Sequence, residues 1–126
     1  MIVGFGLGAF RDPNGIRPLI LGKRSNGKET EYMVASESVA LDVTQFEIDR
    51  DVLPGETLFI NNDGDLHQHN FVGQTSYSPC IFEFVYFARP DSVIDKLSVY
   101  KARLRMGEEL AGQIVRKWPE NDIEVV

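Results

Sequence analysis

The fold prediction starts from one stretch of the chain, Pro79-Cys80-Ile81-Phe82-Glu83-Phe84-Val85-Tyr86-Phe87-Ala88-Arg89-Pro90-Asp91-Ser92. Residues 81–87 are large and apolar apart from Glu83. This run is too short to span a membrane and too apolar for a solvated loop, so it is predicted to be buried. The Arg-Pro pair and the capping-type residues after it predict a turn that holds Arg89 near the polar surface. We therefore expect a junction between two structural units, with sheet before it and helix after it.

The beginning of the chain is predicted to be antiparallel. Residues 1–10 alternate bulky side chains with glycine, which is typical of a strand. The turn signal of residues 11–15 and the apolar residues 16–22 then predict a hairpin. For the charged residues of this turn, a structural ion pair or turn-capping role is favoured over contact with a ligand, because turn chemistry suffices to explain them. The residues assigned to this structural turn are Arg11, Asp12, Gly15 and Arg17.

Further strands and one helical turn are predicted before residue 79. The predicted strands cover residues 32–35, 43–48, 57–60 and 66–71. The last two flank an acidic tip, for which a plain hairpin is favoured over a calcium loop because the twelve-residue ligand pattern is missing. The helical turn begins at Ser36-Glu37-Ser38. There, a serine hydroxyl is expected to cap the exposed amides, and Glu37 is expected to interact with the helix dipole.

Residues 95–117 have the apolar spacing of one amphipathic helix. The apolar positions are Leu97, Tyr100, Leu104, Leu110, Ile114 and Val115. Basic side chains on this segment are offset by neighbouring glutamates, so a solvated face is favoured over a phosphate or nucleic-acid stripe. Residues 118–121 are expected to end the helix, and residues 123–126 to begin a strand.

Composition is that of an ordinary soluble domain. The 126 residues suit one core, with 43% hydrophobic and 25% charged residues and a net charge of -6. The acidic balance argues against non-specific binding of nucleic acid. No long apolar run or signal-like start is present, so neither membrane insertion nor secretion is expected. The single cysteine fits a reducing compartment, and a cytoplasmic location is predicted.

The polar residues that most invite a chemical role are one cysteine and two histidines. Cys80 precedes the apolar run and is expected to be a small buried hydrophobe. His67 and His69 would share one face of a strand, a spacing compatible with joint metal binding. A surface strand is strongly favoured, because a zinc site needs three or four convergent protein ligands. No metal site and no catalytic residue are therefore predicted.

Two residue strings carry a resemblance to a known family: Tyr86-Phe87-Ala88-Arg89-Pro90-Asp91-Ser92 and Ser98-Val99-Tyr100-Lys101-Ala102-Arg103-Leu104-Arg105-Met106-Gly107. They are similar to amidophosphoribosyltransferase, also called glutamine phosphoribosylpyrophosphate amidotransferase. Further matching strings are Phe10-Arg11-Asp12-Pro13-Asn14-Gly15-Ile16-Arg17-Pro18-Leu19 and Tyr32-Met33-Val34-Ala35-Ser36-Glu37-Ser38-Val39-Ala40-Leu41-Asp42, so that the resemblance covers nearly the whole chain. It implies an α+β fold, in which the antiparallel sheet portion of an N-terminal-nucleophile (Ntn) hydrolase αββα sandwich is followed by a linking helix.

The resemblance also implies that the chain is an internal fragment of a longer enzyme. Residues 1–78 match the C-terminal part of a type 2 glutamine amidotransferase domain, and residues 79–97 match the junction between domains. Residues 98–126 match the helix and first strand that lead into the phosphoribosyltransferase domain. In the family, the junction lies close to a channel for ammonia, and the alternative is that its aromatic residues are simply core. The matching junction residues are Tyr86, Phe87, Arg89, Asp91 and Ser92.

The reaction implied by the resemblance transfers glutamine-derived ammonia to phosphoribosyl pyrophosphate and makes 5-phosphoribosylamine in de novo purine biosynthesis. The parent enzyme is expected to use Mg with phosphoribosyl pyrophosphate. In the family, glutamine is attacked by a cysteine at the mature N-terminus, upstream of the matched region, so the isolated chain is expected to be inactive. Some members have an iron–sulfur ligand at the position of Cys80, but the other cysteines are absent here, and no cofactor is expected in this chain.

Two alternatives remain open at this stage. One is a non-catalytic module that binds a partner through the aromatic junction. The other, less favoured, is a small cysteine hydrolase that uses Cys80 with His67 or His69. Because both ends of the chain are predicted to be strands, self-association through exposed strand edges, or oligomerisation of the parent enzyme, is also expected.

Overall fold

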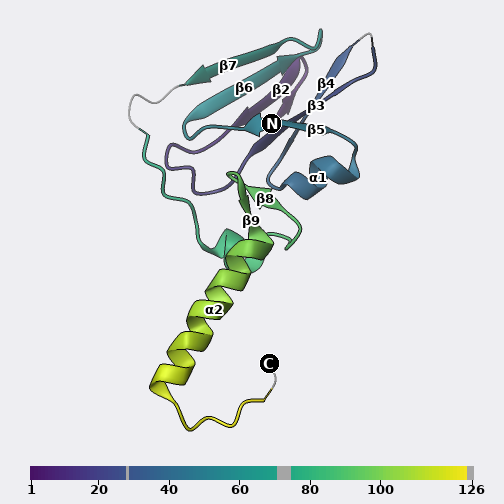
Figure 1. Cartoon of the computed structure of the whole chain (residues 1–126). Helices are drawn as coiled ribbons and strands as arrows, with labels where there is room; N and C mark the ends of the chain where they lie inside the picture. Colours follow the sequence, from purple (N-terminus) through teal and green to yellow (C-terminus); the bar gives the residue numbers. More distant parts are fainter. Residues whose placement is uncertain (28, 71–74, 125–126) are drawn as a thin grey trace.

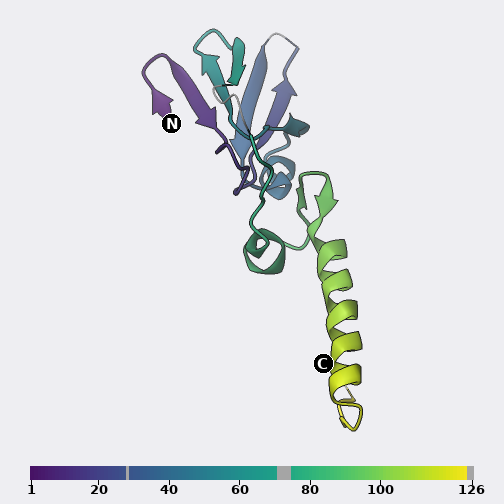
Figure 2. The same cartoon turned by 90° about the vertical axis from the view of Figure 1, so that its left-hand side faces the viewer.

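A computed structural model describes residues 1–27, 29–70 and 75–124 of the chain (Figure 1). Within these residues, two antiparallel sheets form one end of the molecule, and a long helix extends away from them (Figures 1 and 2). The first sheet has the order β1 (Ile2–Val3), β2 (Gly6–Phe10), β6 (Glu56–Asn61) and β7 (Leu66–Asn70). The second has the order β4 (Thr30–Ala35), β3 (Ile20–Ser25) and β5 (Glu47–Asp51).

The main core lies between the two sheets. Its fully buried side chains are Leu21 on β3, Leu58 on β6 and Val52 just after β5. Residues of β6 alternate between buried and half-buried, as expected for a strand with one face on a core. Because the apolar residues of both sheets point into the same space, the sheets are held together by hydrophobic burial.

Helix α1 (Ser38–Val43) links β4 to β5 and packs against the second sheet. Its Leu41 is fully buried. A Cβ at Gly22 of β3 would lie 2.7 Å from Cδ2 of Leu41, a distance shorter than any stable contact. The glycine in β3 therefore allows this helix to approach the strand closely.

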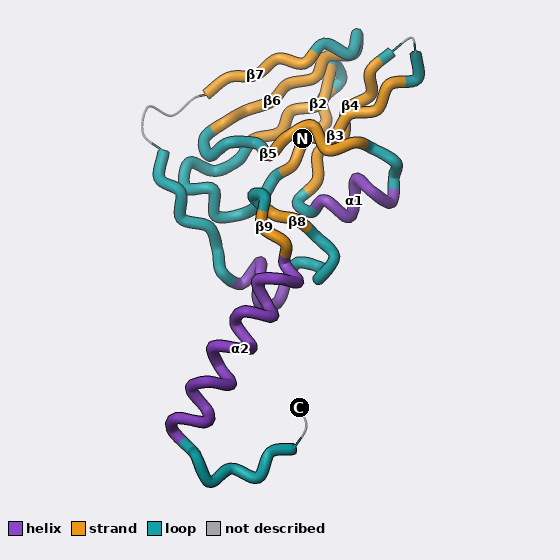
Figure 3. The backbone as a smooth tube through the Cα atoms, in the orientation of Figure 1, coloured by secondary structure: helices purple, strands orange, loops and turns teal. Residues whose placement is uncertain are grey.

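The elements after residue 79 have a small core of their own. They are η1, a π-helical turn (Glu83–Phe87), β8 (Val93–Ile94), β9 (Leu97–Ser98) and α2 (Val99–Lys117), with the longer helix plain in Figure 3. The buried side chains are Phe84, Ala88, Ile94 and Val99. Ser98 caps α2, since its Oγ accepts a hydrogen bond from the Lys101 amide at 3.3 Å. None of the described helices has the length and hydrophobicity needed to cross a bilayer.

The predicted hairpin, in which residues 1–10 pair with residues 16–22 through the turn at residues 11–15, is wrong, and so is the single strand over residues 1–10. β2 pairs with β1 and β6, whereas β3 pairs with β4 and β5, so residues 11–19 cross from one sheet to the other. The crossing brings Leu21 into the core from the second sheet. Residues 1–10 fold back on themselves at residues 4 and 5 as β1 and β2. A turn signal shows that the chain bends, but the partner of each strand depends on where its apolar face is buried.

The predicted burial of residues 81–87 is also wrong. In η1 and the residues before it, only Glu83 and Phe84 are buried. The side chains that are at least half exposed are Ile81, Phe82, Val85, Tyr86 and Phe87. An apolar segment is expected to pack against apolar neighbours. Within the described residues, only the side of this turn that carries Phe84 packs against such neighbours.

Several predicted boundaries shift. Asp95 and Lys96 form the turn between β8 and β9 with positive φ angles of 46° and 66°, so α2 begins at Val99 and not at residue 95. The predicted strand 43–48 is instead the end of α1, a turn and the start of β5. Ser38 does not cap α1, because its Oγ accepts from the amide of Val93. Residues 123 and 124 form no strand, and residues 125 and 126 lie outside the described part.

Other predicted elements are confirmed. β4, β6 and β7 lie where the alternating apolar pattern predicts strands, and β6 and β7 pair as a hairpin. Residue 71, the predicted end of the last strand, lies outside the described residues. Helix α2 ends at Lys117, and its C-cap, Trp118, directly precedes Pro119.

Candidate functional site at the junction

Glu37 connects the sheets to the turn after η1. Its Oε2 accepts hydrogen bonds from the Arg89 amide at 2.8 Å and from Ser92 Oγ at 2.9 Å. Next to it, Ser38 Oγ accepts from the Val93 amide at 2.8 Å. The junction turn is therefore fixed to the first turn of α1. Sequence reasoning gave Glu37 only a helix-dipole role, because a contact across more than fifty residues has no signal in a local pattern.

Replacing Glu37 with alanine is expected to lower the free energy of unfolding by about 1–3 kcal/mol, because the buried Ser92 hydroxyl loses its acceptor. Chemical denaturation of the chain measures the change. Glu108→Ala, an exposed glutamate on α2, is the matched control and is expected to change stability by less than about 0.5 kcal/mol. Equal effects of the two substitutions would show that Glu37 does not anchor the junction.

Arg89 and Asp91 form an exposed bidentate ion pair. Nε and Nη2 of Arg89 each lie 3.0 Å from a carboxylate oxygen of Asp91. The hydrogen bond between them raises the pKa of Arg89 and lowers the pKa of Asp91. Both side chains are more than half exposed, so the pair contributes little to folding. It leaves an oriented charged pair on the surface beside the exposed aromatic residues.

Two arginines contact the η1 turn, one from α2 and one from the crossing between the sheets. From α2, Arg103 donates from Nε to the Phe84 carbonyl at 2.6 Å and from Nη2 to the Ala88 carbonyl at 2.8 Å. The solvated helix face predicted from the sequence therefore does not include Arg103. From the crossing between the sheets, Arg17 Nη1 lies 2.8 Å from Oε1 of the buried Glu83. This contact is not directed as a hydrogen bond, and Oε1 accepts none from the described residues.

The result is an exposed aromatic surface on a fixed backbone. Tyr86 is 77% exposed, and its ring meets that of Phe87 edge-on with centroids 5.6 Å apart. Arg17 also lies over the Phe87 ring, with its Cζ 5.5 Å from the centroid. π-Helical turns are rare and are frequent at functional sites. We call this surface, made of Ile81, Phe82, Val85, Tyr86 and Phe87, the aromatic surface.

Arg11 lies at the centre of a second connection between the sheets and the junction. Its side chain is buried and donates two hydrogen bonds to Asp95, at 2.9 and 2.8 Å, in the β8–β9 turn. It also donates to the carbonyls of Gly15, Arg17 and Val52. Asp12 accepts from two amides of its own turn, those of Asn14 and Ile16. The four residues assigned to this turn thus lie together, but the sequence did not predict that Asp95 is the ion-pair partner.

Tyr77 belongs to the same cluster. Its hydroxyl donates to Asp95 Oδ2 at 2.8 Å. Burial and this hydrogen bond raise the pKa of Tyr77 to about 12. For Asp95, burial favours a higher pKa, but the hydrogen bonds from Arg11 and Tyr77 outweigh it, so the pKa of Asp95 is lowered.

We expect one of the four tyrosines to titrate near pH 12 in the folded chain, well above the ordinary value of about 10. Because the folded pKa of Tyr77 is the higher one, its stabilising contribution is present below pH 10 and is lost as the pH rises through about 12. Ultraviolet absorbance titration measures the transition. Tyr77→Phe should remove the late transition, and its persistence in that variant would contradict the assignment.

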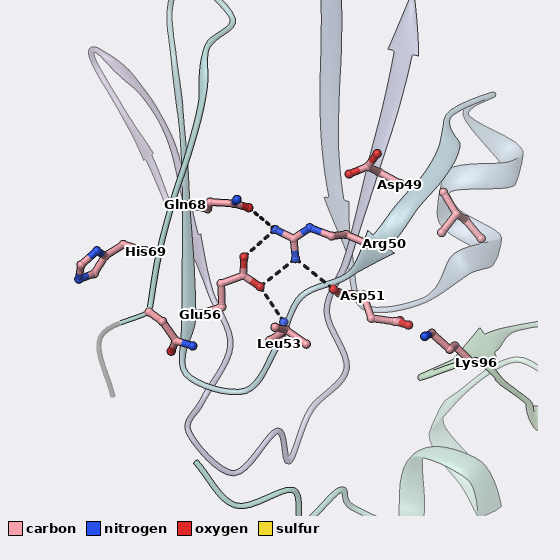
Figure 4. A pocket seen from close by; sticks show the side chains of 10 residues that line it. Asp49, Arg50, Asp51, Leu53, Glu56, Gln68, His69 and Lys96 are labelled. Atoms are coloured by element: carbon pink, nitrogen blue, oxygen red, sulfur yellow. Dashed lines mark hydrogen bonds and ion pairs between the residues drawn. The ribbon is translucent and has the colours of Figure 1, made fainter. Parts of the chain in front are cut away.

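A hollow of about 780 Å³ lies between β5 and the β6–β7 hairpin (Figure 4). At its centre, Arg50 pairs with both oxygens of Glu56 at 2.6 and 2.8 Å and donates to Gln68 at 2.8 Å. Glu56 also accepts from the Leu53 amide. Burial alone favours a higher pKa for Glu56, but these hydrogen bonds lower it. The charges of Arg50 and Glu56 neutralise each other. Their hydrogen bonds connect β5 of the second sheet to β6 and β7 of the first, which is a structural role.

Cys80 and the histidines lie in different parts of the molecule. Cys80 lies just before η1 and is only half-buried, so its predicted burial is wrong, and its amide donates to the Ile16 carbonyl. His67 and His69 lie on β7, the edge strand of the first sheet (Figure 1). The His67 ring stacks on Phe59 at 6.3 Å. Among the described residues, no cluster of three or more His, Cys, Asp or Glu has the arrangement of a metal site.

Comparison with known proteins shows what the whole chain resembles. The chain is 57% identical over 127 aligned residues to the amidophosphoribosyltransferase of Escherichia coli and 54% identical to that of Pasteurella multocida. Along its whole length, the chain is similar to part of an amidophosphoribosyltransferase. The alignments cover all of this chain but 25% of each relative, so the chain spans about a quarter of the length of the curated relatives that it matches. The Saccharomyces cerevisiae enzyme is 48% identical over the same extent of the chain.

A solved structure gives the same result for the fold. The glutamine phosphoribosylpyrophosphate amidotransferase from B. subtilis, complexed with ADP and GMP, matches 98% of this chain with a TM-score of 0.79 and 36% identity. The match covers 24% of that chain. The predicted α+β class, with antiparallel sheets from an amidotransferase followed by a helix, is therefore confirmed. No family model matches the chain.

Proposed function

We propose that this chain is a segment of an amidophosphoribosyltransferase, a parent enzyme that transfers glutamine-derived ammonia to phosphoribosyl pyrophosphate and forms 5-phosphoribosylamine in purine biosynthesis. The observation that carries the proposal is the match of the whole chain to such enzymes at 54–57% identity, together with the shared fold. Mg bound with phosphoribosyl pyrophosphate is part of the proposal for the parent enzyme. Within it, residues 1–78 would complete the glutamine-hydrolysing domain, residues 79–97 the junction, and residues 98–126 the entry to the transferase domain.

In the parent enzyme, the aromatic surface would line the passage that ammonia takes between the two active centres. Large apolar rings exclude water, which would otherwise protonate ammonia and allow it to escape as ammonium. The geometry supports this role because Tyr86 and Phe87 are exposed on a turn whose backbone carbonyls accept hydrogen bonds from Arg103. Arg89, Asp91 and Ser92 follow directly, and Glu37 holds this turn against the sheets.

The isolated chain would have neither glutaminase nor transferase activity. Cys80 is the single thiol of the sequence, and no described side chain forms a hydrogen bond that would activate its sulfur. A cysteine nucleophile needs such a base and an oxyanion hole. The chain would therefore contribute scaffold and passage, while the chemistry would belong to other parts of the parent.

The test compares the 126-residue chain with the product of the complete gene that encodes it. The longer product is expected to release pyrophosphate from phosphoribosyl pyrophosphate only when glutamine or ammonia is present, and the chain alone is expected to release none. In the longer product, Tyr86→Ala should reduce the glutamine-dependent rate while the rate with added ammonia is retained. A longer product without either activity would overturn the proposed function.

The aromatic surface also favours a second candidate, a non-catalytic module that binds a partner. Its five large side chains are each at least half exposed, which is unusual for a surface that stays in water. Size-exclusion chromatography with light scattering would test it, since a defined dimer of the isolated chain that dissociates on Phe82→Asp would favour self-association through this surface. A monomer whose elution and mass do not change on Phe82→Asp would exclude this candidate.

A further inference from the structure

A groove lies between the β8–β9 hairpin and one side of α2, apart from the aromatic surface. It has a volume of about 710 Å³. Its apolar wall is formed by Val93, Leu97, Ala102, Met106 and Leu110. Leu97 and Leu110 are 56% and 59% exposed, so the wall faces solvent at both ends of the groove. An exposed apolar groove of this volume, beside basic side chains, indicates a surface that a polypeptide covers.

The charge of the groove is opposite to that of the chain as a whole. Lys101 and Arg105, one helical turn apart, line it and are exposed, and neither forms an ion pair with a described residue. Lys96 adds a third positive charge, and Glu109 is the acidic residue among the lining side chains. Like charges four residues apart on a helix repel each other, so an anionic partner would stabilise both Lys101 and Arg105. This occurs in a chain with a net charge of -6, which makes the positive groove a local feature.

We propose that the groove is covered by an apolar polypeptide segment flanked by carboxylates, supplied by the part of the parent enzyme outside this chain. This inference rests on the proposed function. About three quarters of the length of the relatives lies outside the matched region, so enough chain exists to supply the segment. A small anion fits the two cations but cannot cover the apolar wall. A symmetric contact with a second copy through α2 is disfavoured, because both helices present the same positive charges.

Hydrogen-exchange mass spectrometry tests the proposal on the complete gene product and on the 126-residue chain. Amides of residues 105–113 are expected to exchange at least about tenfold more slowly in the complete protein, because the covered helix opens less often. The charge reversal Lys101→Glu with Arg105→Glu should remove most of this protection. Lys117→Gln is the control on α2, since Lys117 lies outside the groove lining and outside residues 105–113, and it should preserve the protection.

The possible outcomes separate this proposal from the proposed function. Equal exchange of residues 105–113 in both proteins, or equal loss of protection in the groove variant and in the Lys117→Gln control, would overturn the covered groove. A protected groove in a complete protein that lacks glutamine-dependent activity would keep this proposal and overturn only the function. Protection that appears only on dimerisation, and that rises with protein concentration in the 126-residue chain, would assign the groove to a second copy and overturn the proposal. Exchange within β6 serves as the folding control, because a variant that unfolds also loses protection there.

Discussion

Replacing Arg11 with methionine is expected to lower the free energy of unfolding by about 3–5 kcal/mol. The substitution removes a buried ion pair with Asp95 and leaves the carbonyls of Gly15, Arg17 and Val52 without their donor. The carboxylate of Asp95 remains in a site from which most water is excluded. Urea denaturation followed by circular dichroism measures the loss.

Arg24→Met provides the control for Arg11. Arg24 is 43% exposed, pairs with Glu31, donates to the Thr44 carbonyl and lies over the Phe46 ring, so its loss should cost about 1–2 kcal/mol, less than the loss of Arg11. The pH dependence gives a second check. Because the pKa of Asp95 is lowered in the folded chain, its stabilising contribution is present above the ordinary value of about 4 and is lost as the pH falls through the folded pKa. This acid-side loss should be smaller in Arg11→Met, and an unchanged profile would contradict the role of the pair.

Replacing Arg103 with alanine is expected to cost about 2–4 kcal/mol, because two charge-assisted hydrogen bonds to the carbonyls of Phe84 and Ala88 disappear at once. Both of these residues belong to the small core of the junction. The η1 turn should then lose its hold on α2, and hydrogen exchange over residues 83–88 should speed up more than exchange within the sheets.

Arg105→Ala is the matched control for Arg103. It removes the same side chain from the same helix at an exposed position, and in the isolated chain it should change stability by less than about 0.5 kcal/mol. If Arg103→Ala lowered stability without a local increase in exchange over residues 83–88, Arg103 would be a general stabiliser and would not position the aromatic turn.

Local pattern was sufficient for the regular elements. The residues 57–60 and 66–71, which flank the turn-type residues 61–65, predicted β6 and β7, and residue 71 lies outside the described residues. The apolar spacing and Trp118-Pro119 predicted the existence and the end of α2. The start of α2 was missed because Asp95 and Lys96 adopt left-handed backbone conformations, which are unfavourable for residues other than glycine. The hydrogen bonds of Asp95 with Arg11 and Tyr77 stabilise this turn.

The candidate site was predictable only in part. The strings around Tyr86 and Arg89 resembled amidophosphoribosyltransferase, and along its whole length the chain is similar to part of such enzymes. The residues that hold this segment were not identified, because Glu37 and Arg103 act over large sequence separations. Arg103 has the same local pattern as the solvated Arg105, and only the three-dimensional position of the Phe84 carbonyl separates the two.

The sequence by itself determined the α+β class, the strands of the β6–β7 hairpin, the end of α2 and the resemblance to amidophosphoribosyltransferase. Each of these depends on residues that are close in the chain or on strings that can be compared directly. The tertiary structure alone decided that β2 and β3 belong to different sheets, that Arg11 pairs with Asp95, and that the aromatic surface is exposed. These depend on which distant segments share buried space, because a side chain is buried or paired only by what folding places next to it.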